Sequence, residues 1–327
     1  MPLAAGIGLV AVLALVLSRT LAPARPHVYA GNGGIDASPL YDSSASAYDA
    51  YELVLPAEFA PADPSLPAIS GSLIKGGPAL DALVRATRAI EDEGYAVGYA
   101  LYNVANGMSV TYNADSAFYS ASSLKGPYVT SLVRYELGDS AQSESRRIGD
   151  VIRYSSNSSY SALRDAYGNG AFEQMVAASG AEGLPSSLAD PDAERAAELL
   201  GANGIADDNY EFVTPAQLLA LWRQCYEFLS SDESGAEWLA SIFEQPETSA
   251  IRVTAGALGT TWSKAGWYPA DGAGYGTTVD AGVVRIDAGD LVLAVMTTKP
   301  EDMVAIDGIV SSLVNLGASS ATSATTS

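Results

Sequence analysis

Two groups of short β-strands, separated by a long helical stretch, limit what this chain of 327 residues can fold into. Apolar patterning predicts two strands at 95–104 and 108–113, joined by a hairpin turn. Three more strands are predicted at 260–266, 277–286 and 291–298. Strand groups so far apart in sequence share a sheet only if the chain between them folds to one side. We therefore predict an α+β fold with one five-stranded antiparallel sheet.

Helical periodicity supplies the rest of this architecture. Apolar residues at helical spacing predict an N-terminal helix at 78–94 and a C-terminal helix at 301–316, which flank the sheet. Between the strand groups, helices are predicted at 145–166, 170–179 and 214–229. These form an all-helical lobe, and we expect a cleft between the lobe and the sheet.

The two ends of the chain lack such patterning. Residues 3–17 are all apolar or small, which is typical of a signal-peptide core, so we expect a signal peptide or membrane anchor at 1–25, with a buried helix of the domain as the alternative. Composition predicts a flexible linker at 26–75 and a disordered tail at 318–327. The folded domain is then 76–317, and the protein is expected to be extracytoplasmic, either secreted or anchored by its N-terminus.

Charge and composition exclude several classes of function. The net charge is −21 and the pI is about 4.2, and a chain so acidic repels phosphate backbones, so nucleic acid is not an expected partner. His27, the single histidine, lies in the predicted linker. A Ser-His-Asp site needs a histidine in the folded domain, and a zinc site needs several His or Cys ligands. Because glycine motifs for nucleotides are missing as well, we expect no metal and no cofactor.

The single cysteine, Cys225, excludes an intramolecular disulfide. Its neighbours, "LALWRQCYEFL", are helical and apolar in pattern. We expect a small core residue there, with a free thiol as the alternative.

A serine and a lysine three residues apart, Ser122 and Lys125, precede an apolar run in "FYSASSLKGPYVTSLVRYE". Residues i and i+3 of a helix share a face, so the two side chains can meet. A serine hydroxyl needs a base, and a lysine among apolar or cationic groups loses proton affinity and can serve as one. The pair is therefore a candidate nucleophile and general base. The same spacing recurs at Ser72 and Lys75, but without partner motifs around it.

Two later motifs strengthen the hypothesis that this pair is catalytic. Ser155-Ser156-Asn157 stands at the head of a predicted helix, and Lys264-Ala265-Gly266 lies on a predicted strand. Helix capping and an exposed strand lysine are the structural alternatives. In order, the S-x-x-K, S-x-N and K-x-G motifs resemble those of the penicillin-recognising serine hydrolases, and most of all the class A β-lactamases, over residues 80–316.

The resemblance implies a catalytic role for four side chains. Ser122 would be the acylated nucleophile and Lys125 its general base. Ser155 would relay a proton to the leaving nitrogen, and Lys264 would hold the Ser155 hydroxyl.

The resemblance also implies three residues that bind or orient the substrate. Asn157 would orient Lys125 and the substrate amide. Gly266 would let the strand backbone pass close to the ligand. The oxyanion hole would consist of the backbone N–H groups of Ser122 and Trp267.

The chain departs from the family pattern in several places. Ser156 replaces an aspartate, and Ala265 replaces a hydroxyl residue that binds the substrate carboxylate in the family. The short interval from Ser122 to Ser155 implies a trimmed lobe and a more open cleft. Between residues 180 and 210 there is no E-x-x-L-N, the segment whose glutamate activates the deacylating water in the family.

These motifs lead us to expect a serine acyl-enzyme hydrolase that acts on β-lactams. The alternatives are a D,D-peptidase activity on cell-wall peptides and a non-catalytic wall-binding module of the same fold. The expected partner is a small β-lactam or a wall peptide, the membrane is contacted only through the N-terminal segment, and the protein is expected to be a monomer.

Overall fold

The computed structural model describes residues 53–54, 66–70, 73–74, 77–181, 212–270 and 275–319. The predicted signal or anchor segment, most of the predicted linker and residues 320–327 of the predicted tail lie outside these ranges. Within them, no helix combines the length and the apolar character that crossing a membrane requires.

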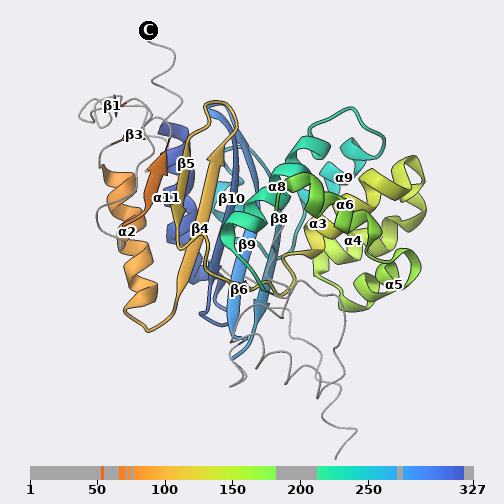
Figure 1. Ribbon diagram of the computed structural model, residues 1–327, viewed down its shortest axis with the longest axis horizontal. Helices are drawn as coiled ribbons and strands as arrows, with labels where there is room; N and C mark the ends of the chain where they lie inside the picture. Colours follow the sequence, from red (N-terminus) through yellow and green to blue (C-terminus); the bar gives the residue numbers. More distant parts are fainter. Residues whose placement is uncertain are drawn as a thin grey trace, which may run out of the picture. The chain divides into compact units, whose positions relative to one another are not determined.

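The predicted α+β architecture is confirmed, with an antiparallel sheet of six strands (Figure 1). In sheet order the strands are β2 (Ala68–Ser70), β5 (Ser109–Tyr112), β4 (Val97–Asn103), β10 (Gly289–Thr297), β9 (Thr277–Ile286) and β8 (Thr260–Tyr268). The two strand groups join where β10 pairs with β4, with Ala294 opposite Ala100. This junction makes one sheet from segments almost 200 residues apart, and it leaves β8 at an edge.

The sheet has one strand more than the sequence predicts. β2 lies within the expected linker and pairs with β5, so that Ile69, which is buried, faces Val110 in the register. Three residues are too few to show an alternating pattern, which is why this strand escaped prediction. Two further strand pairs lie outside this sheet: β1 (Leu53–Val54) with β3 (Leu73–Ile74), and β6 (Phe118–Tyr119) with β7 (Phe212–Val213).

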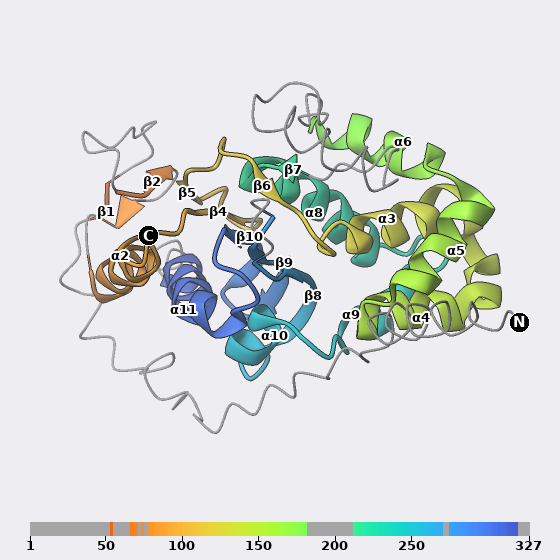
Figure 2. The same cartoon turned by 90° about the horizontal axis from the view of Figure 1, so that it is seen from below.

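Helices cover both faces of the sheet. α2 (Pro78–Glu91) and α11 (Met303–Ser319) pack against each other, and α10 (Ala250–Ala255) lies beside α11. α8 (Pro215–Leu229) packs on β4, β9 and β10 from the opposite face (Figure 2). It begins with a complete capping box, in which Thr214 and Gln217 bond each other's backbone N–H, followed by a proline at the first position.

The remaining helices form the predicted lobe next to α8. They are α3 (Lys125–Leu132), α4 (Ser145–Tyr154), α5 (Asn157–Tyr167), α6 (Gly170–Ser179) and α9 (Ala236–Phe243), with a π turn at Val133–Leu137 and a 3₁₀ segment at Gly138–Glu144. One apolar core runs from these helices through α8 into the sheet, and at its centre the Trp222 and Phe243 rings lie 5.6 Å apart. The lobe and the sheet are therefore held together by a common core.

Cys225 lies on α8 in this core and is fully buried, as expected for a small apolar residue. Burial raises the pKa of its thiol to about 12, so little thiolate forms at neutral pH.

The single helix predicted at 145–166 is wrong, because the structure divides it into α4 and α5. Ser155 ends α4 in a left-handed conformation, with φ 57° and ψ 31°. Ser156 then caps α5, since its hydroxyl accepts a hydrogen bond from the Ser159 N–H at 3.2 Å. The polar pair Ser155-Ser156 therefore interrupts the helix at the motif from which a site was predicted.

Candidate active site

Ser122 lies in a tight turn between β6 and α3, not on the helix itself. Lys125 is the first residue of α3, and its N–H donates to the Ser122 carbonyl at 3.2 Å. Ala121, immediately before Ser122, has φ 46°, a conformation that costs a non-glycine residue on the order of 1 kcal/mol. Pro127 is only the third helical residue, where an N–H has no partner inside the helix, so it does not disturb the first turn.

Gly266 brings the edge strand β8 against this turn. A Cβ atom at position 266 would lie 2.6 Å from the Ser122 nitrogen and 2.7 Å from the Ser123 nitrogen, so only glycine fits. On an edge strand, alternate N–H groups point away from the neighbouring strand. The Ser122 backbone and the β8 backbone next to Trp267 are thereby placed side by side.

The Lys125 amine is buried, and the groups that accept its hydrogen bonds are neutral and do not balance a positive charge. Its Nζ donates to the Ser155 carbonyl at 2.8 Å and to Asn157 Oδ1 at 2.5 Å, and it lies 5.5 Å from the centre of the Tyr160 ring. The residue is only 5% exposed. Burial lowers the pKa of Lys125 from its ordinary value to about 8, so a useful fraction is neutral near neutral pH.

The Lys264 amine, which comes from β8, also contacts Ser155, the residue that Lys125 contacts. Its Nζ donates to Ser155 Oγ at 3.0 Å and to the Ala265 carbonyl at 2.6 Å, and the residue is 2% exposed. Burial and then the charge of Lys125 lower the pKa of Lys264 to about 7, while Asp280 opposes the shift.

Ser155 is the residue that joins the two lysines. Its left-handed backbone points the carbonyl at Lys125 and the hydroxyl at Lys264. The structure thus brings Lys125, Ser155, Asn157 and Lys264 into one network, with Gly266 and Ser122 in contact beside it.

Two residues of this neighbourhood were missed by sequence reasoning. Tyr160 lies on α5, three residues after Asn157, and helical spacing alone could have suggested it. Asp280 lies on β9 opposite Ala265 and is fully buried. The available signal was an acidic residue in the middle of a strand of mostly apolar and small residues.

Asp280 connects β9 to the start of α10. Its Oδ2 accepts from Ser249 Oγ at 2.7 Å and from the Ile251 N–H at 2.9 Å, whereas Oδ1 has no partner among the described residues. Burial raises the pKa of Asp280 to about 6, so the group is a carboxylate at neutral pH. Its negative charge partly balances the Lys264 ammonium.

The hydrogen-bond count suits a neutral amine at Lys125. A neutral amine has two N–H donors and one lone pair, whereas an ammonium has three donors. The Ser155 carbonyl and Asn157 Oδ1 take two donors, and among the described residues the amine has no third acceptor. A neutral Lys125 therefore keeps a lone pair free to take a proton.

Some residues named from the sequence lie outside the described ranges. They are Ser72 and Lys75 of the second S-x-x-K, and the interval 182–211, which covers most of the stretch searched for a deacylation motif.

Comparison with known proteins supplies the family. The model of the Beta-lactamase enzyme family matches residues 146–316, about half of the chain, including Ser155, Asn157, Lys264 and Gly266. A search of curated proteins finds no match.

Solved structures agree on the fold. A β-lactamase from Sphaerobacter thermophilus DSM 20745 superposes with a TM-score of 0.54 at 18% identity, over 72% of this chain and 97% of its own. A class A β-lactamase from Mycobacterium abscessus gives 0.53 at 20% identity, over 73% and 97%. PBP-A, seen as an acyl-enzyme with penicillin G, gives 0.52 at 18% identity, over 72% and 95%. At such identities the similarity establishes the fold alone.

Proposed function

This chain belongs to the beta-lactamase enzyme family, and on that premise we propose that it hydrolyses β-lactams through an acyl-enzyme formed on Ser122. The observation that carries the proposal is the double contact of Ser155, whose carbonyl holds one buried lysine and whose hydroxyl holds the other. A purely structural lysine needs no such burial, because burying an amine away from carboxylates costs free energy.

Acylation begins with the transfer of a proton. The Ser122 hydroxyl gives its proton to the lone pair of neutral Lys125, and Oγ bonds to the β-lactam carbonyl carbon. The carbonyl oxygen becomes an oxyanion that accepts hydrogen bonds from the Ser122 and Trp267 N–H groups. Each such donor contributes about 2.7–4 kcal/mol to the stability of the transition state.

The second half of acylation uses Ser155 and Lys264. The carbon–nitrogen bond of the ring breaks, and the nitrogen takes the Ser155 hydroxyl proton. Ser155 recovers a proton from the Lys264 ammonium, which already donates to its oxygen at 3.0 Å. Water then attacks the ester carbonyl carbon, the bond from that carbon to the Ser122 oxygen breaks, and the oxygen takes back its proton from the Lys125 ammonium. The opened ring leaves as a carboxylate. The two protons of the water pass to solvent, from which Lys264 regains its ammonium form.

A D,D-peptidase of the same chemistry is the second candidate. The sequence observation that favours it is the missing E-x-x-L-N between residues 180 and 210, because an acyl-enzyme without a positioned base for water persists. Its substrate would be a wall peptide, and its ester with penicillin would be long-lived.

One experiment separates these candidates. Purified protein is mixed with benzylpenicillin, and its intact mass is followed over time. A transient adduct with turnover supports the β-lactamase, and a lasting adduct supports the peptidase. Ser122→Ala should give no adduct, whereas Ser123→Ala, one residue along, should retain it. No adduct on the native chain would overturn both enzymatic proposals and favour a binding module.

Location and assembly complete the proposal. An extracytoplasmic monomer would meet β-lactams and wall peptides directly, and the acidic charge suits a soluble surface. Expression of the full chain, with N-terminal sequencing of the exported product, tests whether residues 1–25 are removed.

A further inference from the structure

Four aromatic rings gather at the end of β8 nearest to Ser122. They belong to Tyr119 on β6, Phe212 on β7, Tyr268 on β8 and Tyr275, just before β9, and we call them the aromatic cluster. The Tyr119 ring is central: its centre lies 5.1 Å from Tyr275, 5.6 Å from Tyr268 and 5.8 Å from Phe212. Most of these contacts are edge-to-face or tilted, the geometry that aromatic rings prefer.

The cluster is tied to the nucleophile through two chains of contact. Tyr119 precedes Ser122 by three residues, and its carbonyl accepts a hydrogen bond from Thr277 Oγ1 at 3.1 Å, which fixes the turn to β9. Tyr268 follows Gly266 by two residues, and Gly266 touches the Ser122 backbone. Two strand residues span about 7 Å, so the Tyr268 Cα lies about that far along β8 from Gly266.

Strand geometry also places Tyr268 on the reactive face. Side chains alternate along a strand, so Lys264, position 266 and Tyr268 share one face of β8. Gly266 stands between the lysine and the tyrosine, at the point where the strand meets Ser122. The reacting carbonyl would therefore have the amine on one side and the aromatic cluster on the other.

The proton relay decides which part of a substrate lies on which side. The leaving nitrogen must approach the Ser155 hydroxyl, which Lys264 holds. The acyl portion, which stays on Ser122, then points along β8 toward Tyr268. Tyr268 is 38% exposed, so its side chain has surface available for contact.

We propose that the aromatic cluster binds the acyl group of the substrate, and that this group ends in an aromatic or similarly flat apolar ring. The inference rests on the proposed function, because it needs a substrate attached to Ser122. The rings are held by one another and by the strands that carry them, so little side-chain freedom is lost on binding.

The test compares two β-lactams that share the reacting ring. Benzylpenicillin carries a phenylacetyl group, and 6-aminopenicillanic acid has none. Second-order acylation rates on Ser122 are measured for both by quenched intact-mass time courses. The native chain should react with benzylpenicillin at least tenfold faster, and Tyr268→Ala should lower that ratio about tenfold. Tyr268→Phe, which keeps the ring, should preserve it.

A matched control comes from Tyr95, a partly exposed tyrosine in the turn between α2 and β4, and Tyr95→Ala should leave the ratio unchanged. If the ratio in Tyr268→Ala equals that of the native chain, the aromatic cluster does not bind the acyl group, even though acylation itself occurs. If neither compound acylates the native chain, the proposed function fails and this inference fails with it.

Discussion

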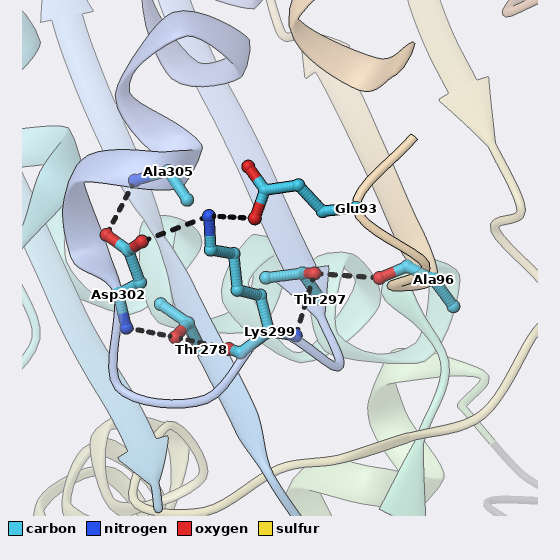
Figure 3. A network of polar contacts seen from close by, with 7 residues as sticks. All are labelled: Glu93, Ala96, Thr278, Thr297, Lys299, Asp302 and Ala305. Atoms are coloured by element: carbon cyan, nitrogen blue, oxygen red, sulfur yellow. Dashed lines mark hydrogen bonds and ion pairs between the residues drawn. The ribbon is translucent and has the colours of Figure 1, made fainter. Parts of the chain in front are cut away.

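Lysines occupy two contrasting regions of this molecule. At the candidate site, Lys125 and Lys264 are buried beside neutral hydrogen-bond acceptors, and burial lowers the pKa of each. At the far end of β10, Lys299 lies between Glu93 and Asp302, at 2.7 and 3.2 Å, and these carboxylates raise its pKa (Figure 3). The same side chain is therefore prepared for proton transfer in one place and kept charged in the other.

The surroundings of Lys299 explain what that second arrangement does. Asp302 accepts from the Ala305 N–H at the start of α11, and Thr278 Oγ1 donates to the Lys299 carbonyl at 2.7 Å. Figure 3 shows these contacts linking the loop after β10 to β9 and to the turn before β4. Ion pairs this close to solvent contribute about 0–1 kcal/mol each, so the contacts around Lys299 link chain segments and add a little stability. At the candidate site, by contrast, burial of two amines lowers the stability of the fold and makes the lysines available for proton transfer.

The largest effect should come from removing each lysine in turn. Lys125→Ala should slow acylation by benzylpenicillin by about 10²–10⁴-fold, since a general base contributes that much. Lys299→Ala should change the rate less than twofold. Intact-mass time courses on the two variants measure both, and similar rates for the two would break the comparison.

The close approach of β8 to the Ser122 turn at Gly266 should be nearly as important. Gly266→Ala would place a Cβ 2.6 Å from the Ser122 nitrogen, and we expect acylation to fall about 10²–10³-fold as the oxyanion donors separate. Gly170→Ala is the matched control, because a Cβ there meets no atom within 4 Å. Unchanged acylation in Gly266→Ala would show that the contact has no catalytic importance.

The pH profile should show both lowered pKa values. Acylation needs Lys125 neutral and Lys264 protonated, so its rate should peak between pH 7 and 8. It should fall about fivefold at pH 6 and again at pH 9, because one of the two forms is then depleted. A rate that climbs steadily to pH 10 would mean that the amines keep their ordinary pKa.

Removing the lysine should change the free energy of unfolding in opposite directions in the two regions. Since the folded pKa of Lys264 is about 7 and the unfolded value is ordinary, the unfolded chain binds more protons between pH 7 and 10, and stability rises with pH there. Lys264→Met combined with Asp280→Asn removes both members of the buried charge pair, and it should raise the free energy of unfolding at pH 7 by about 1 kcal/mol. Lys299→Met should instead lower it by up to about 1 kcal/mol. Urea midpoints give both values, and a destabilised Lys264→Met/Asp280→Asn variant would contradict the account.

The sequence predicted the architecture because its apolar periods are clear. The strand groups and their flanking helices follow from alternation and helical spacing, and the two groups merge into one sheet as expected. The structure adds that they join through the pairing of β4 with β10. The association of Ser122 with Ser155 and Lys264 came from the order of three motifs that resemble a family. Spacing alone could not have given it, because tertiary packing brings together residues more than 100 positions apart.

Other features could not be predicted from local pattern. The break at Ser155 depends on a left-handed backbone whose cost is offset by two tertiary hydrogen bonds to lysines. Ser122 lies in a turn, not on the helix, and the close approach of Gly266 on β8 to this turn is a tertiary contact that local pattern does not reveal. Asp280 acts across the strand pair from Ala265, and only the register reveals it.

The central claim is that two lysines of this chain lose their protons near neutral pH. The chain has only four lysines, Lys75, Lys125, Lys264 and Lys299, so a titration of ¹³Cε-labelled lysine by NMR would resolve each one. The account predicts two titrations between pH 7 and 8, assigned by Lys125→Ala and Lys264→Met, and a third lysine, Lys299, that titrates above its ordinary pKa. Four signals that all titrate at or above pH 10 would contradict it.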